Sequence, residues 1–191
     1  MNMAASPGSF LLATFLGLIS LVSSDKFLCN QPASSAETIY KFGAADINKS
    51  RNISFSEYQG KVVLLEPEGN GTEILHALQY VRPGNGFEPS FQMMEMVDVN
   101  GKNEHPLFTY LKKYCPPTSD EFEDGLFYSP LKVNDVRWNY EQFLVDRTGK
   151  IRMRYHHHTD PSALAGDIDS LLREGEPEIE MSNEIPTHRL H

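Results

Sequence analysis

The chain has 191 residues, a formal net charge of −9 and two cysteines. This acidity argues against nucleic acid and anionic membrane surfaces as partners, because both repel a negatively charged protein. Two cysteines are too few for a disulfide-built scaffold, so the fold must depend on one hydrophobic core. We therefore expect a single domain whose partners are small molecules or other proteins.

An apolar run at residues 10–22 follows an uncharged N-terminus. The run is shorter than a membrane span and precedes small residues, which is typical of a signal peptide cleaved after Ser24. An uncleaved membrane anchor is the alternative, since the usual basic residues before such a run are absent. We expect residues 1–24 to be a signal peptide and the mature protein to be secreted. Three sequons would then be glycosylation acceptors in the secretory lumen: Asn48, Asn52 and Asn70.

Short elements are expected after the leader. Residues 38–42 alternate in polarity, and together with residues 53–55 they suit a hairpin. Residues 56–60 read as one helical turn that ends at a glycine. The continuous apolar run at residues 61–65 predicts a core strand that is buried on both faces, with helices packed against its sheet.

The middle of the chain alternates helical and extended patterns. Thr72 can cap a helix that ends at Pro83, with apolar residues at helical spacing: Ile74, Leu75, Leu78 and Val81. Residues 91–99 favour a strand, although their methionines suit a helix nearly as well. Pro106 begins a helix with Leu107 and Leu111 on one face, for which His105 is a helix entry rather than a metal ligand.

The last third of the chain contains the clearest hairpin. Residues 142–145 and 150–155 alternate on either side of a turn that contains a glycine. Thr159, Asp160 and Pro161 then provide the cap and first turn of a helix that ends at Gly175. The acidic loop at residues 118–125 should be exposed. Residues 174–191 carry little apolar content and are expected to be a mobile tail, which leaves residues 25–173 as the domain.

Common catalytic templates are missing from the sequence. It contains no glycine-rich phosphate loop, no CxxC pair, no GxSxG serine and no HExxH. The run His156, His157 and His158 could suggest a metal, but side chains of an extended segment point to opposite faces. A solvated or interface cluster is the better interpretation, and no metal site is expected. Cys29 and Cys115 can form one structural bridge or remain two inert thiols, and the alternative is a reactive thiol at Cys115.

Six sequence blocks resemble the glutathione peroxidase family, in the family's own order. They are GKVVL at 60–64, EIL at 73–75, YVRPGNGF at 80–87, DVNG at 98–101, HPLF at 105–108 and WNYEQFLV at 138–145. Residues 115–137 are similar to the longer loop of the secreted, tetrameric branch. This resemblance implies an α/β, thioredoxin-like three-layer fold. It also implies thiol-dependent reduction of hydrogen peroxide and organic hydroperoxides in antioxidant defence, with glutathione or another thiol as co-substrate and no bound cofactor.

The family mechanism needs a selenocysteine or cysteine, because an ionised chalcogen attacks the peroxide oxygen at neutral pH. A Gln amide, a Trp indole N–H and an Asn amide stabilise that anion by hydrogen bonds. Trp138 and Asn139 match the last two of these groups. Arg82 matches a basic position that helps to attract the anionic thiol, whereas His156–His158 stand where some members have arginines.

The nucleophile and the Gln have no counterpart in this chain. In the family, the GKVVL strand continues into the nucleophile loop, a helix and a second strand that ends at the Gln. Here Leu65 passes directly to Glu66, which resembles a segment beyond that motif. We therefore expect an incomplete fold without one core strand and one helix, with an unpaired sheet edge that favours aggregation or oligomerisation.

Two hypotheses about function follow from the resemblance. The first is a working thiol peroxidase, which would need an unrecognised nucleophile such as Cys115. The second is a non-catalytic isoform that binds partners or co-assembles with full-length subunits, as a homo-oligomer or a mixed oligomer.

Overall fold

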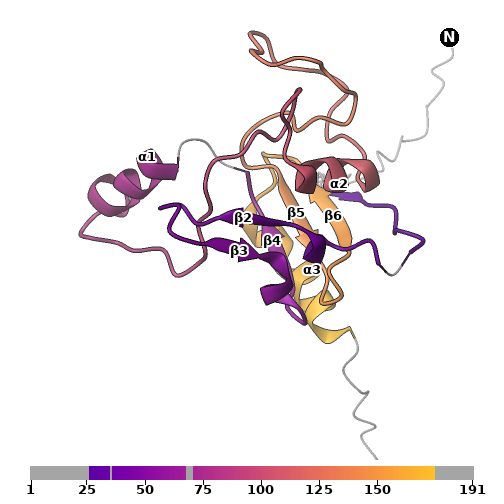
Figure 1. The fold of residues 1–191 in the computed structure, drawn as a ribbon, viewed down its shortest axis with the longest axis horizontal. Helices are drawn as coiled ribbons and strands as arrows, with labels where there is room; N and C mark the ends of the chain where they lie inside the picture. The colour runs from indigo at the N-terminus through magenta and orange to yellow at the C-terminus, as the bar shows by residue number, and fades with distance from the viewer. Residues whose placement is uncertain (1–25, 35, 68–70, 175–191) are drawn as a thin grey trace, which may run out of the picture.

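A four-stranded antiparallel sheet forms the centre of the computed structural model, which describes residues 26–34, 36–67 and 71–174. Its strands lie in the order β1 (Lys26–Leu28), β6 (Ile151–Tyr155), β5 (Gln142–Val145) and β4 (Val63–Leu65) (Figure 1). The predicted hairpin is confirmed as β5 and β6. The sheet therefore ends at β4, which includes the last two residues of the GKVVL block.

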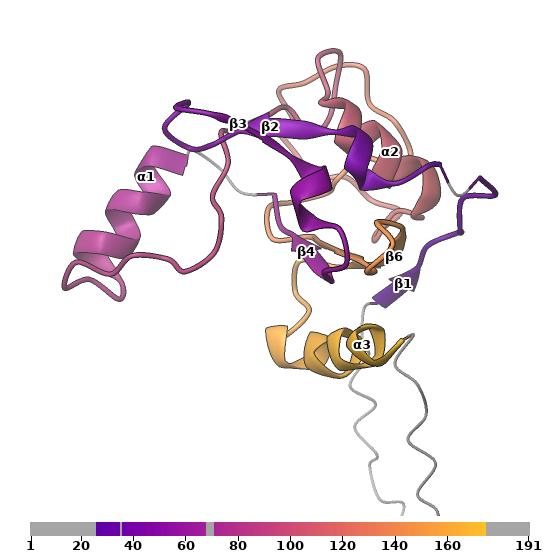
Figure 2. The same ribbon diagram turned by 60° about the horizontal axis from the view of Figure 1, so that its bottom comes forward.

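Helices cover both faces of this sheet. Helix α2 (Pro106–Tyr114) packs on one face, where Leu107, Phe108 and Leu111 meet Phe143 and Val145 of β5. Helix α3 (Pro161–Arg173) packs on the other face, where its buried leucines meet residues of β5 and β6. Figure 2 shows the resulting order of α2, sheet and α3. The predicted mixed α/β, three-layer arrangement is thus confirmed.

A second, two-stranded sheet lies beside this body. It pairs β2 (Gly43–Ala45) with β3 (Asn52–Ser54), and short 3-10 turns η1 (Ile39–Lys41) and η2 (Phe55–Tyr58) flank the two strands. The expected hairpin exists, but placing its first strand at residues 38–42 was wrong. Ile39 is fully buried in the core of the larger sheet, so this segment packs as a turn and pairing begins at Gly43.

The GKVVL strand is an edge strand in this fold. Its partner β5 pairs with it from Leu65↔Phe143 to Val63↔Val145, and within the described residues no strand pairs with its other side. Leu64 is 42% exposed. The prediction that this strand is buried on both faces was therefore wrong, whereas the prediction of an unpaired edge is confirmed.

The predicted helix after Thr72 is present as α1 (Gly71–His76), which continues into the π-helical turn η3 (Ala77–Val81). It projects from the rest of the domain on the β4 side in both views (Figures 1 and 2). The strand expected at residues 91–99 was wrong. That segment forms one isolated bridge, Asp46↔Met94, because no neighbouring strand extends the pairing.

Helices α2 and α3 begin as expected. His105 Nδ1 accepts a hydrogen bond from the Leu107 backbone N–H at 3.3 Å, and Asp160 caps Ser162 N at 2.8 Å. The predicted signal peptide, the predicted helix stop at Gly175 and nearly all of the predicted tail lie outside the described residues. Within the described part of the chain, no helix has the length and apolarity needed to cross a membrane.

Candidate functional site

The Trp138–Asn139 pair lies on a loop beside the C-terminal end of β4. Tyr140 N donates a hydrogen bond to Pro67 O at 3.2 Å, and Gln142 Nε2 donates to Glu66 Oε2 at 2.9 Å. These bonds join the loop to the point where the chain leaves the sheet. Trp138 is 51% exposed and Asn139 is also exposed, so both hydrogen-bond donors stand on an open surface.

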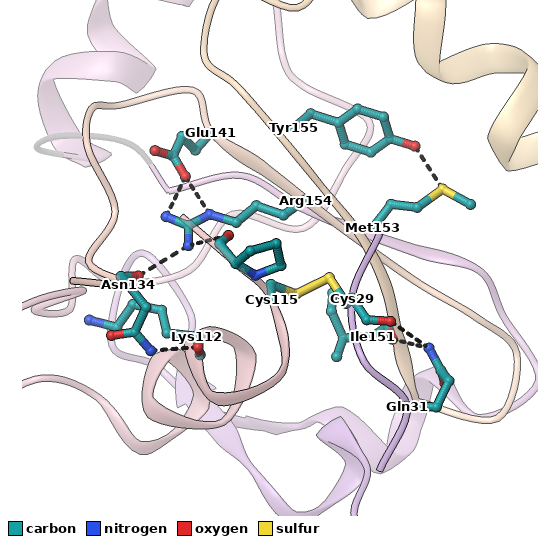
Figure 3. The surroundings of a disulfide bond; sticks show 11 residues. Cys29, Gln31, Lys112, Cys115, Asn134, Glu141, Ile151, Met153, Arg154 and Tyr155 are labelled. Atoms are coloured by element: carbon teal, nitrogen blue, oxygen red, sulfur yellow. Dashed lines mark hydrogen bonds and ion pairs between the residues drawn. A yellow bond between two sulfur atoms is a disulfide. The ribbon is translucent and has the colours of Figure 1, made fainter. Parts of the chain in front are cut away.

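A buried carboxylate fixes the ends of this loop. Glu141 Oε1 accepts hydrogen bonds from Arg137 N at 2.8 Å and from Thr118 Oγ1 at 2.7 Å. Its other oxygen pairs with Arg154 at 2.7 Å, and both side chains are fully buried (Figure 3). Because Arg137 and Glu141 bracket the pair, this network determines where Trp138 and Asn139 lie.

A second buried cation, Lys112, holds the segment that leads into this loop. Lys112 Nζ on α2 donates to Glu104 at 2.6 Å, to Asp135 at 2.8 Å and to Asn100 Oδ1 at 2.9 Å. Burial raises the pKa of Glu104, but hydrogen bonds from Lys112 and Thr109 outweigh it, so the pKa lies below its ordinary value. The Glu104 carboxylate therefore stays ionised beside Lys112.

Sequence reasoning missed these supporting residues. The available signal was the DVNG block at 98–101, because its Asn100 accepts from Val136 N at 2.9 Å and donates to Val136 O at 2.8 Å. Asn100 thereby holds the segment that leads into Trp138. A charged side chain on an apolar helix face, such as Lys112, gives no comparable signal before its partners are known.

Both cysteines are joined in one disulfide, Cys29–Cys115, with an S–S distance of 2.05 Å (Figure 3). The bridge ties the segment after β1 to the end of α2, and its residues are 8% and 3% exposed. The structural-bridge alternative is confirmed, and a free reactive thiol at Cys115 is not. Since the sequence has two cysteines, no thiol in the chain remains available as a nucleophile.

An apolar hollow of about 810 Å³ opens along the free edge of β4. Side chains of β4, of α1 and η3 and of the 91–99 segment line it, among them Val63, Leu65, Ile74, Leu78 and Phe91. The hollow also reaches Tyr140, next to the Trp138–Asn139 pair. This is the side of the sheet on which a further strand would pair.

Arg82 lies apart from the other candidates. It is an exposed residue at the end of η3, where its backbone N–H donates to Ala77 O at 2.8 Å. In the described part of the chain, no hydrogen bond or ion pair joins Arg82 to Trp138 or Asn139. Trp138 and Asn139 are therefore neighbours on one loop, and Arg82 is not joined to that loop.

Two of the three predicted glycosylation sites are described. Asn48 lies in the turn between β2 and β3, and Asn52 is the first residue of β3. Both side chains belong to exposed residues, which is the accessibility that an acceptor requires. Asn70 lies outside the described residues.

The histidine run departs from its expected geometry. Strand β6 ends at Tyr155, and His156 O accepts a hydrogen bond from Thr159 N at 2.9 Å, so residues 156–159 form a turn. The premise that three adjacent histidines point to opposite faces was therefore wrong. Burial lowers the pKa of His157, and neighbouring His156 and His158 lower it further.

Comparison with known proteins agrees with the sequence blocks. The family model of glutathione peroxidase matches residues 65–112. Glutathione peroxidase 3 of Hylobates lar is 37% identical over 207 residues, covering 86% of this chain and 91% of the relative. Glutathione peroxidase 6 of Mus musculus is 33% identical over 213 residues, covering 87% and 96%.

A solved structure supports the fold as well. The apo crystal structure of Trgpx is 25% identical and superposes with a TM-score of 0.50, covering 73% of this chain and 99% of that one. The relatives above exceed 30% identity over most of their length and most of this chain. This chain therefore belongs to the glutathione peroxidase family.

Proposed function

We propose that this chain serves the thiol peroxidase system of its family as a form without its own nucleophile. The family reaction, by resemblance, is the reduction of hydrogen peroxide and organic hydroperoxides by glutathione or another thiol. In this chain Trp138 and Asn139 would be the retained half of the catalytic site. Without a chalcogen between them and the peroxide, their N–H donors have no anion to stabilise.

The observation that carries the proposal is the Cys29–Cys115 disulfide. It removes both thiols of the chain from nucleophilic chemistry, and both residues are buried away from a peroxide in solution. A disulfide sulfur carries no thiolate, which is the species that attacks. The alternative of a peroxidase that uses Cys115 is accordingly disfavoured.

Sequence alignment supports a missing internal segment. The match to the Hylobates lar relative spans 207 residues yet takes in 86% of this chain, which is about 164 of its 191 residues. About 43 positions of the relative are then left without a counterpart. The family-model match begins at Leu65, the residue after which the nucleophile segment is expected to be missing.

A peroxidase assay tests the proposal directly. The secreted chain is mixed with glutathione, glutathione reductase and NADPH, and NADPH oxidation is followed after adding hydrogen peroxide or an organic hydroperoxide. We expect the rate of the buffer blank, while a full-length relative that carries its nucleophile turns over. Catalysis above the blank that disappears in Cys115→Ser would refute the proposal and establish Cys115 as the nucleophile.

Co-assembly with full-length subunits is the role that the free β4 edge favours. The edge strand and its hollow offer unpaired backbone groups and apolar surface to another subunit. Co-expression with a differently tagged full-length subunit should give a mixed oligomer on affinity capture. Capture of the full-length subunit without this chain, under conditions where both are secreted, would count against this role.

Secretion and domain limits are part of the same proposal. Residues 1–24 would be removed as a signal peptide, residues 25–173 would form the domain, and residues 174–191 would be an acidic tail. The Cys29–Cys115 disulfide supports an oxidising compartment. Expression in mammalian cells should place the chain in the medium, and treatment with an N-glycosidase should lower its apparent mass through Asn48, Asn52 and Asn70.

Arg82 is proposed as a contact for the anionic thiol. It is exposed and free of any ion pair in the described part of the chain, so its guanidinium is available to a carboxylate. Arg82→Ala should weaken the binding of glutathione to this chain, which isothermal titration calorimetry measures. Unchanged binding would remove Arg82 from the site.

A further inference from the structure

In the turn after β6, the imidazole rings of His156, His157 and His158 lie close together, although an extended segment would point them to opposite faces. His156 and His157 stack with ring centroids 4.0 Å apart, and His158 lies 4.1 Å from His157 and 5.0 Å from His156. One ring nitrogen of each residue lies within 4.8 Å of the others. Hydrogen bonds within the turn, from Thr159 N to His156 O and from His158 N to His156 Nδ1, hold this conformation.

Two polar atoms in this turn are buried without a hydrogen-bond partner among the described residues. They are His157 Nδ1 and Thr159 Oγ1. Buried polar atoms in native proteins are nearly always paired, so each orphan requires an explanation. A cation bound by the three neighbouring imidazoles would account for the unpaired His157 nitrogen.

The surrounding charges suit a cation more than an anion. Glu141 and Glu123 are the carboxylates that act electrostatically on His157. Glu141 is already paired with Arg154, whereas Glu123 belongs to the exposed acidic loop. The rings of His156 and His157 are half-buried and that of His158 is exposed, so an ion can reach them from solvent.

We propose that His156, His157 and His158 bind one divalent transition-metal ion, with Zn²⁺ as the representative ion. Zn–N bonds of 2.0–2.1 Å in a tetrahedral site place ligand nitrogens about 3.3 Å apart. The rings therefore close around the ion by rotation of side chains that the turn has already brought together. Three imidazoles leave a fourth position for water.

Competition with a chromophoric chelator at neutral pH tests the proposal on the full secreted chain. We expect one equivalent of Zn²⁺ to bind, and His157→Ala to weaken binding by about tenfold or more. The combined variant H156A/H157A/H158A should abolish it. His76→Ala is the matched control, because it removes an exposed imidazole on α1, and H188A/H191A tests the two histidines of the C-terminal segment. Zn²⁺ binding that persists in the triple variant, or that is lost in either control, would overturn the proposal.

A measurement on the unmodified protein keeps the test independent of folding defects. Diethyl pyrocarbonate acylates accessible imidazoles, and peptide mapping locates the modified residues. One equivalent of Zn²⁺ should protect His156–His158 while His76 reacts at its metal-free rate. Equal modification of the three histidines with and without Zn²⁺ would refute a site at this turn, whatever the variants show.

Discussion

At the scale of single residues, the buried Glu141–Arg154 pair is expected to contribute strongly to stability. Both side chains are fully buried and their ion pair measures 2.7 Å. Arg154 also donates to the carbonyl oxygens of Pro116, Asn134 and Asp135, so its charge cannot leave the interior. Glu141→Ala should lower the free energy of unfolding by about 3–5 kcal/mol, because it leaves an uncompensated buried cation. Urea denaturation followed by circular dichroism measures this change.

An exposed ion pair is the matched control for Glu141→Ala. Arg51 and Glu57 lie 3.3 Å apart with both side chains about half exposed. Arg51→Ala should change the free energy of unfolding by less than about 1 kcal/mol, since water screens such pairs. Comparable losses in the two variants would show that burial does not set the strength of the Glu141–Arg154 pair.

The disulfide makes its own prediction. Cys29 and Cys115 are 86 residues apart, so their bridge restricts a long loop of the unfolded chain. The double variant C29S/C115S should lower the free energy of unfolding by about 2–5 kcal/mol. Denaturation of the wild-type chain with and without a reductant should reproduce the loss. An unchanged unfolding midpoint would mean that the bridge is absent in solution.

At the scale of elements, the β5–β6 turn depends on one carboxylate. Asp146 Oδ1 accepts hydrogen bonds from Thr148 N at 2.8 Å and Thr148 Oγ1 at 2.6 Å, and Oδ2 pairs with Arg152 at 3.2 Å. Burial raises the pKa of Asp146, but the bonds from Thr148, Lys150 and Arg152 outweigh it and hold the pKa below its ordinary value. Ionised Asp146 therefore stabilises the folded state more than the unfolded one.

The sign of the pH dependence follows from that lowered pKa. The contribution of Asp146 is complete above its unfolded pKa of about 4 and is lost as the pH falls through the lower folded pKa. Asp146→Asn should lose on the order of 1 kcal/mol at pH 7 and show a shallower decline in stability below about pH 4. Thermal unfolding from pH 2 to 7 measures both. Glu88→Gln, at an exposed residue, is the control, and a decline as steep as wild type in Asp146→Asn would contradict the assignment.

Local patterns predicted the elements that depend on local interactions. The β5–β6 hairpin and helices α2 and α3 appear where the turn, cap and proline signals placed them. The strand expected at residues 91–99 did not form, because a strand requires a neighbour and this segment finds a single bridge to Asp46. The first strand of the other hairpin begins at Gly43 rather than at residue 38, because burial of Ile39 outweighs the alternating polarity of residues 38–42.

At the scale of the whole molecule, the sequence blocks predicted the family but not the buried network that supports the Trp138–Asn139 loop. Pairs such as Glu141–Arg154 and Lys112–Asp135 join residues that are 13 and 23 positions apart in the sequence, and no local sequence pattern indicates such pairs. The geometry of the histidine run was predicted wrongly, because an extended segment was assumed where the chain turns. The free edge at β4 was expected from the family resemblance, and β4 is an edge strand in the described part of the chain.

That free edge leads to a prediction about association. Leu64 lies opposite Leu144 in the β4–β5 pair and is 42% exposed, beside unpaired backbone groups and the apolar hollow. Edge strands of this kind associate with other chains, and a lysine on the edge opposes association because its charge would be buried. The wild-type chain should form concentration-dependent oligomers in sedimentation velocity, and Leu64→Lys should shift them towards monomer.

The control for Leu64→Lys is Val133→Lys, which adds the same charge at an apolar residue that is 78% exposed in a loop away from β4. Both substitutions change the formal net charge from −9 by the same single positive charge, so a difference between them isolates the edge. Val133→Lys should associate like wild type. If both variants become monomeric together, the added lysine acts without regard to its position, and the edge does not control association. If Leu64→Lys oligomerises like wild type, β4 is not the contact, and co-assembly with full-length subunits must use another surface.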